Sequence, residues 1–130
     1  MYKRQCLDLR LPLGLDPQDI AQKIAKALAP AGLTLTDTRI QPGHFVPADS
    51  ELVQALLRVY GDRTGQKDPK PLAIGGGTYA RCIPNAVAFG CERPGLDNRI
   101  HQPNEFIPLD NLLDDACMMA DAILALACQP

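Results

Sequence analysis

The chain has 130 residues, with 13 basic and 15 acidic side chains and a net charge of −2. This length suits one domain, and 46% hydrophobic with 22% charged residues is typical of a folded protein rather than a disordered one. No basic block suggests nucleic-acid binding, no apolar run approaches the ~20 residues of a membrane span, and no secretory leader is recognisable. We therefore expect a soluble, cytoplasmic protein with no nucleic-acid or membrane partner.

The first forty residues predict a strand, a helix and a second strand. Residues 6–12 and 33–40 alternate apolar and polar side chains, as half-buried strands do. Between them Asp16 is the predicted N-cap of a helix with Pro17 at its first position, and Pro30 with Gly32 ends it. Such a unit alone leaves one face uncovered, so we expect the chain to be part of a longer protein. The apolar stripe of the helix consists of Ile20, Ile24 and Leu28.

The rest of the chain predicts two more helices and two short strands. One helix begins near Asp49 and ends near Gly65, and the last covers about 109–127. Apolar segments at 71–74 and 85–90 predict short buried strands. The predicted buried positions are Leu52, Val53, Leu56, Leu57 and Tyr60 in the first of these helices, and Leu112, Leu113, Ala116, Ile123, Leu124 and Ala127 in the last, with Met119 and Ala120 at its flank.

The cysteines form an odd set without a Cys-x-x-Cys pair, unlike a secreted disulfide framework or a Cys-rich zinc site. We predict that they are small buried hydrophobic residues in a reducing compartment. The alternative is a reactive nucleophile, for which no activating motif is present. The five are Cys6, Cys82, Cys91, Cys117 and Cys128.

A glycine-rich loop follows the strand predicted at 71–74. Gly75 to Gly77 would present unhindered backbone N–H groups, which suit an oxyanion or a carboxylate, although the loop is neither a P-loop nor a dinucleotide-binding motif. A tight turn after a buried strand explains the glycines as well. Arg81 and Arg10 are either guanidinium donors for an anion or ordinary surface and salt-bridge residues.

The polar segment 101–105 contains His101, one of two histidines, and Glu105. The imidazole is either an ordinary loop residue or one corner of a metal site. A zinc or cobalt site needs about three protein ligands, and His44 is the other imidazole of the chain. Glu105 could orient His101 from outside the metal's ligand set. The residue types alone leave both interpretations open.

In chain order the sequence contains LDLRLP, VPADSELVQALLRVYGDRTG, IGGGTYARCIPNAVAFG, RPG, HQPNE and an alanine-rich closing helix. Together these segments resemble the C-terminal part of the M20 family of metallopeptidases, and most of all its PepV-type (Xaa-His, carnosinase-like) dipeptidases. The resemblance implies an α/β (α+β) fold. Residues 1–41 would be the C-terminal half of a ferredoxin-like lid domain, and residues 42–130 the C-terminal part of the catalytic domain.

The resemblance also implies roles for individual residues. His101 matches the family's last metal ligand. Arg10 matches the lid arginine that grips the C-terminal carboxylate of the substrate. Gly76 and Thr78 lie where the family's loop offers donors to a bound dipeptide. Arg81 and Glu105 would have supporting roles.

By the same likeness, the complete enzyme would hold two Zn²⁺ ions, with Co²⁺ or Mn²⁺ as alternatives, and would hydrolyse the peptide bond of a dipeptide substrate. The family's other metal ligands and its glutamate base match no segment here. We therefore expect that the missing N-terminal part of the same enzyme is the partner of this piece, which would be inactive alone. The alternatives are a non-catalytic binding module of the same fold and an N-acyl amino acid amidohydrolase of the same family.

Overall fold

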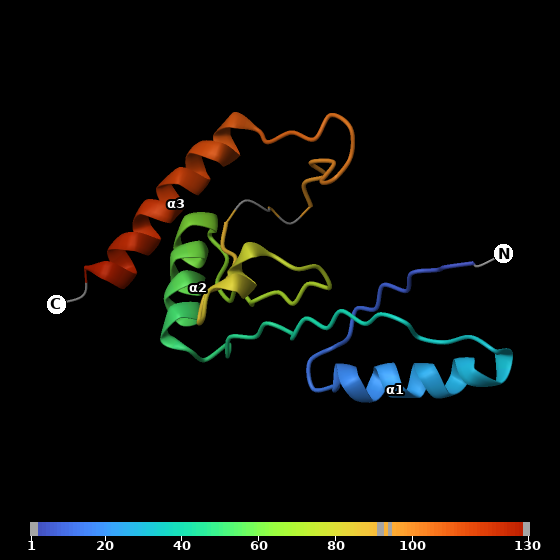
Figure 1. Cartoon of the computed structure of the whole chain (residues 1–130). Coiled ribbons are helices and arrows are strands. Elements are labelled where there is room, and N and C mark those ends of the chain that lie inside the picture. Colours follow the sequence, from blue (N-terminus) through green and yellow to red (C-terminus); the bar gives the residue numbers. More distant parts are fainter. Residues whose placement is uncertain (1–2, 91–92, 94, 129–130) are drawn as a thin grey trace.

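The computed structural model describes residues 3–90, 93 and 95–128, and its regular elements are helical (Figure 1). The helices predicted near the start, middle and end of the chain are confirmed. In order, the elements are α1 (Pro17–Leu28), the 3-10 turn η1 (Ala29–Ala31), α2 (Glu51–Thr64), the 3-10 turn η2 (Tyr79–Cys82) and α3 (Leu109–Ala127).

Local capping explains where α1 and α2 begin and end. The side chain of Asp16 accepts a hydrogen bond from the N–H of Gln18 at 2.9 Å, as an N-cap does. Ser50 caps α2, one residue after the predicted start, by accepting from the N–H of Val53 at 3.4 Å. Gly65 ends α2 in the left-handed conformation, with φ of 73°.

The four predicted strands do not form strands in the part of the chain that the structure describes. Segments 6–12, 33–40, 71–74 and 85–90 run without regular secondary structure, and no backbone hydrogen bonds pair them with one another. Figure 1 shows the first two as long extended runs that lead into and out of α1. Alternation predicts which side chains would face a core, but a strand also needs a neighbour to accept and donate its backbone hydrogen bonds.

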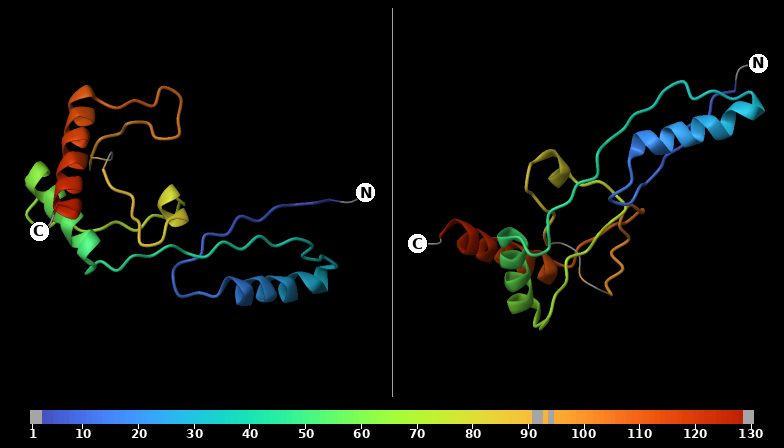
Figure 2. Two further views of the ribbon diagram at one scale, coloured as in Figure 1. Left: turned by 60° about the vertical axis from the view of Figure 1, so that its left-hand side comes forward. Right: turned by 90° about the horizontal axis from the view of Figure 1, so that it is seen from below.

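The core lies where α2 packs against α3, and the two helices lie next to each other in both views of Figure 2. α1 packs against neither of them, and its predicted stripe is only half-buried. The buried members of the core are Leu56, Val59, Met118 and Ala122, and Leu52, Tyr60, Val87, Phe89 and Ala125 pack around them partly buried.

The buried face of α3 differs from the prediction. α2 covers the face that carries Asp115, Met118 and Ala122, whereas Leu113 and Ile123 are 65% and 64% exposed. The other predicted core positions of α3, namely Leu112, Ala116, Leu124 and Ala127, are exposed as well. By helical spacing the acidic residues of α3 lie on one side, and α2 packs toward that side and leaves the broad apolar side exposed. Despite this apolarity, none of the described helices has the length and hydropathy to span a membrane.

The prediction of buried cysteines is also wrong for those that the structure describes. Cys91 lies outside the described residues. The other cysteines are unpaired and exposed because the segments that carry them have no covering element; they are Cys6, Cys82, Cys117 and Cys128.

Removing the central side chain of the core should destabilise the α2–α3 pair. Met118 has no exposed surface, so Met118→Ala should lower the free energy of unfolding by about 2–5 kcal/mol through lost burial and a cavity. Met119→Ala, next along the chain but 36% exposed, is the matched control and should cost clearly less. Urea denaturation followed by circular dichroism measures both. Equal losses would contradict the assignment of the core.

The ion pair between α2 and α3 should make their packing pH-dependent. Arg63 donates from Nε to Oδ2 of Asp121 at 2.6 Å, and this hydrogen bond lowers the pKa of Asp121 below its usual value. A depressed carboxyl pKa stabilises the fold above about pH 4, the ordinary value for Asp, and this contribution disappears as pH falls through the folded pKa. Wild type should therefore exceed Arg63→Met in unfolding free energy at about pH 6, and the difference should vanish near pH 2. A difference that persists in acid would rule out the ion pair as its cause.

Candidate functional site

The guanidinium of Arg10 reaches the glycine-rich loop. Its Nη1 donates to the carbonyl oxygen of Gly75 at 3.3 Å, and its Nη2 donates to Oδ2 of Asp8 at 3.1 Å. The contact joins residues 65 positions apart in the chain. Two sequence features that were singled out separately therefore meet in the folded chain.

The glycine-rich loop is open on one side and covered on the other. Gly75 and Gly76 would have nothing within 4 Å of an added Cβ, so their backbone faces open space. At Gly77 an added Cβ would lie 2.6 Å from Nη1 of Arg81, which places that guanidinium over the loop. None of these glycines has positive φ. The loop therefore offers accessible backbone without the left-handed turn that an anion-binding nest of N–H groups uses.

Thr78 and Arg81 connect this loop to η2. Thr78 precedes the turn in an extended conformation, and its carbonyl accepts from the N–H of Arg81 at 3.3 Å. The Thr78 hydroxyl makes no capping hydrogen bond. It therefore keeps its donor and acceptor capacity beside the exposed backbone of Gly76.

His101 lies in a loop over residues 98–106 that is closed by its own hydrogen bonds. The N–H of Phe106 donates to the carbonyl of Asn98 at 3.2 Å, which brings the two ends of the loop together. His101 has φ of 61°, an uncommon conformation for a residue with a side chain, and it is exposed. Its backbone N–H donates to Oε2 of Glu105 at 3.4 Å. Glu105 thus contacts the main chain of His101 rather than its ring.

His101 could supply one imidazole to a metal ion, but this chain does not complete a site around it. The ring makes no hydrogen bond to any described residue, so its nitrogens are accessible. Within the described ranges no three His, Cys, Asp or Glu residues gather as a metal-binding group. Zinc sites use about three protein ligands or more. No hydrogen bond or ion pair between described residues links the His101 ring to Arg10.

Sequence reasoning missed two contacts. His44 places Nε2 2.5 Å from the carbonyl oxygen of Ala86, which ties the segment before α2 to the segment after η2. Arg93 forms a buried ion pair with Asp115, at 2.7 Å. In the sequence, the only indication of the Arg93–Asp115 pair was the position of Asp115 among apolar residues of the last helix.

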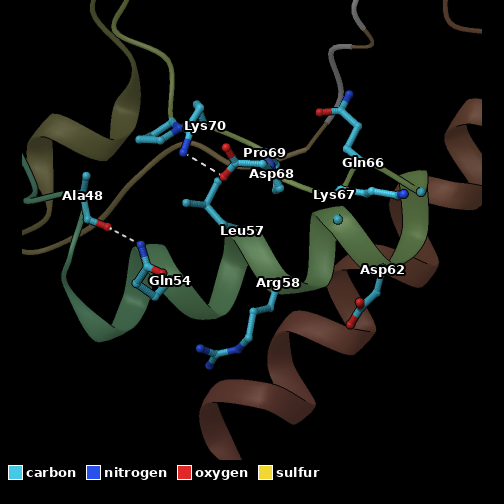
Figure 3. A pocket seen from close by; sticks show the side chains of 13 residues that line it. Ala48, Gln54, Leu57, Arg58, Asp62, Gln66, Lys67, Asp68, Pro69 and Lys70 are labelled. Atoms are coloured by element: carbon cyan, nitrogen blue, oxygen red, sulfur yellow. Dashed lines mark hydrogen bonds and ion pairs between the residues drawn. The ribbon is translucent and has the colours of Figure 1, made fainter.

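An open depression of about 700 Å³ lies beside α2 and the segment that follows it. Figure 3 shows Leu57 facing the segment where Lys70 pairs with Asp68, and Gln54 bonded to the carbonyl of Ala48. None of the six predicted site residues lines it. We therefore place the candidate site at the glycine-rich loop and the His101 loop instead.

The two histidines should differ in reactivity. The bond to Ala86 restrains His44, whereas the His101 ring is exposed and makes no hydrogen bond to any described residue. Diethyl pyrocarbonate should therefore modify His101 faster than His44, as measured by peptide mass spectrometry. The two rates should converge in denaturant. A slower reaction at His101 in the folded chain would show that its ring is not accessible.

Comparison with known proteins places these elements in a family. Residues 15–125 match the model of peptidase family M20/M25/M40. The chain is 34% identical over 119 residues to the Beta-Ala-Xaa dipeptidase of Lactobacillus delbrueckii subsp. lactis, covering 92% of this chain and 25% of that protein. It is 32% identical over 123 residues to a Staphylococcus epidermidis protein named "Putative dipeptidase", covering 95% and 26%.

The chain thus spans about a quarter of the length of these relatives. The family match covers most of the chain, and it implies a peptidase α/β fold, of which the described residues form only helices. The chain belongs to peptidase family M20/M25/M40.

Proposed function

We propose that this chain is the C-terminal part of a zinc-dependent dipeptidase, to which it contributes one metal ligand and part of the substrate clamp. The observation that carries the proposal is the contact of Arg10 with Gly75. It holds a permanent positive charge beside an exposed glycine backbone, in a chain that belongs to a peptidase family. A guanidinium beside open space suits the carboxylate end of a short peptide.

Arg10 binds the C-terminal carboxylate of the dipeptide. Its present partner Asp8 is exchangeable, because the two side chains are 64% and 78% exposed and such surface pairs contribute about 1 kcal/mol or less. The carboxylate of a substrate can therefore replace that of Asp8 and accept hydrogen bonds from the Arg10 guanidinium. The bond to Gly75 keeps the guanidinium at the loop in the absence of substrate.

Gly76 and Thr78 bind the peptide backbone of the substrate. The Gly76 backbone lies in open space, and the Thr78 hydroxyl is not used for capping. Arg81 supports the loop by lying over Gly77, where any other residue would bring a Cβ within 2.6 Å of its guanidinium.

His101 is the metal ligand of the piece. When bound, zinc would polarise the peptide carbonyl and lower the pKa of a coordinated water. Glu105 supports His101 by accepting its backbone N–H. The remaining ligands and the general base would come from the rest of the enzyme, so the isolated chain is inactive.

The partner of this chain is the missing N-terminal part of the same enzyme. Residues 1–41 form the second half of the lid, and residues 42–130 complete the catalytic domain. The exposed leucines of segment 6–12 and the exposed apolar face of α3 are the surfaces that this missing part would cover. The enzyme acts in the cytoplasm, where its unpaired cysteines stay reduced.

A chimera tests the proposal. This chain replaces the matching quarter of the Beta-Ala-Xaa dipeptidase, and amino-acid release from a β-alanyl dipeptide with zinc is measured. His101→Ala should lower kcat/KM by about 100-fold or more, since a lost ligand weakens the metal site. Gln102→Ala, in the same loop, is the control and should retain activity.

The same chimera separates the role of Arg10. Arg10→Ala should raise KM about 10- to 100-fold, which corresponds to one lost charged hydrogen-bonding interaction. Arg4→Ala, in the same exposed segment, should not. A chimera that cleaves only N-acyl amino acids would favour an amidohydrolase. Hydrolysis by the isolated chain with zinc, or full activity of the His101→Ala chimera, would contradict the proposal.

A further inference from the structure

We infer that Arg93 is a positioning residue for His101. Its buried ion pair with Asp115 fixes where the loop over residues 98–106 sits on α3. That the placed residue is a metal ligand rests on the proposed function. The placement itself does not, so the two can be tested apart.

The Arg93–Asp115 pair is unlike the other ion pairs of the described residues. Nη2 of Arg93 lies 2.7 Å from Oδ1 of Asp115, and the two side chains are 16% and 7% exposed. Every other pair in the described part of the chain has both side chains at least 37% exposed. Asp115 is also the one buried charged residue among those described. It lies on the face of α3 that packs against α2, one turn from Met118.

This pair is poorly suited to a purely stabilising role. Apart from the 2.7 Å contact of Nη2 with Oδ1, the pair has no polar partner among the described residues: Nη1 of Arg93 and Oδ2 of Asp115 are buried without a hydrogen bond. Buried charges with incomplete hydrogen bonding recover little of their desolvation cost, and apolar residues of similar size often serve stability as well. Such a pair can instead fix the position of the segment that carries Arg93 relative to α3. We attribute this function to the ion pair.

Gly90 also lies close to α3, one helical turn from Asp115. Gly90 has φ of 89°, and an added Cβ there would lie 2.7 Å from Cε of Met119. Gly90 and Arg93 therefore contact α3 at positions 119 and 115, four residues apart on the helix. Val87 and Phe89, just before them, pack on the core. The incoming arm of the His101 loop is thus anchored to α3 before the loop begins.

Hydrogen bonds between residues close in the chain connect Arg93 to the loop that carries His101. The N–H of Leu96 donates to the carbonyl of Arg93 at 3.1 Å, and the N–H of Arg99 donates to Oδ1 of Asp97 at 3.0 Å. The N–H of Gln102 then donates to the carbonyl of Arg99 at 2.8 Å. The outgoing arm enters α3 at Leu109. The chain therefore contacts α3 both before and after the His101 loop. Removing the Arg93–Asp115 ion pair would remove the contact before the loop.

Amide hydrogen exchange on the ¹⁵N-labelled 130-residue chain tests the inference. Arg93→Met should accelerate exchange at Gln102, Glu105 and Phe106, the loop's hydrogen-bonded amides, about tenfold relative to the amides of α2. Arg93→Lys, which keeps the charge, should restore most of the protection. Arg63→Met is the matched control, because it removes the other ion pair of α3 without touching the loop. It should leave the loop amides unchanged relative to α2.

Three results would overturn the inference. They are unchanged loop exchange in Arg93→Met, equal acceleration in the loop and in the helices, and a wild-type loop that is already unprotected. If Arg93→Met does not fold, Asp115→Asn, which keeps the shape and removes the charge, is read by the same criteria. A placed loop together with an active His101→Ala chimera would support the positioning role and reject only the metal assignment.

Discussion

The packing of Met118 against Leu56 and Val59 is the interaction on which the rest of this structure depends. It joins α2 to α3, and these two helices carry the segments that hold the candidate site. The glycine-rich loop follows α2, and the His101 loop leads directly into α3. Because the described segments outside the helices form no sheet, the α2–α3 pair is the packed unit from which both loops extend. A loss of this small core would therefore remove the support of both loops.

The core lies on only one face of α3, so other apolar surfaces of the chain stay exposed. α3 buries one face against α2 and leaves large apolar residues such as Leu113 and Ile123 on the other. The segments with strand-like alternation stay extended and exposed. Elements of this kind are normally covered by a further layer. The length relationship agrees, since the chain spans about a quarter of its relatives. The exposed faces and the short span both agree with the proposal that more of the same protein packs there.

The candidate site is built from two loops that are held in different ways. The glycine-rich loop is held through side chains, with Arg10 bonded to Gly75 on one side and Arg81 lying over Gly77 on the other. The His101 loop is held mainly by its own backbone, with Arg99, His101 and Asn104 at positive φ. Residues with side chains adopt that conformation at some cost, and it persists where the surroundings enforce it. The inferred role of the ion pair of Arg93 with Asp115 is to add such a constraint from outside the loop.

The sequence by itself determined the helices, their caps and the family, because these depend on short-range signals. Asp16 caps α1 and Gly65 ends α2 through contacts within a few residues, and spaced motifs identify a family without any folding. Only the tertiary structure decided which face of α3 is buried, since α2 packs on the face that carries Asp115 and leaves the more apolar face with Leu113 and Ile123 exposed. It also revealed the contact of Arg10 with Gly75 and the pairing of Arg93 with Asp115. Those partners lie far apart in the chain, and the position of one does not constrain the other until the backbone is folded.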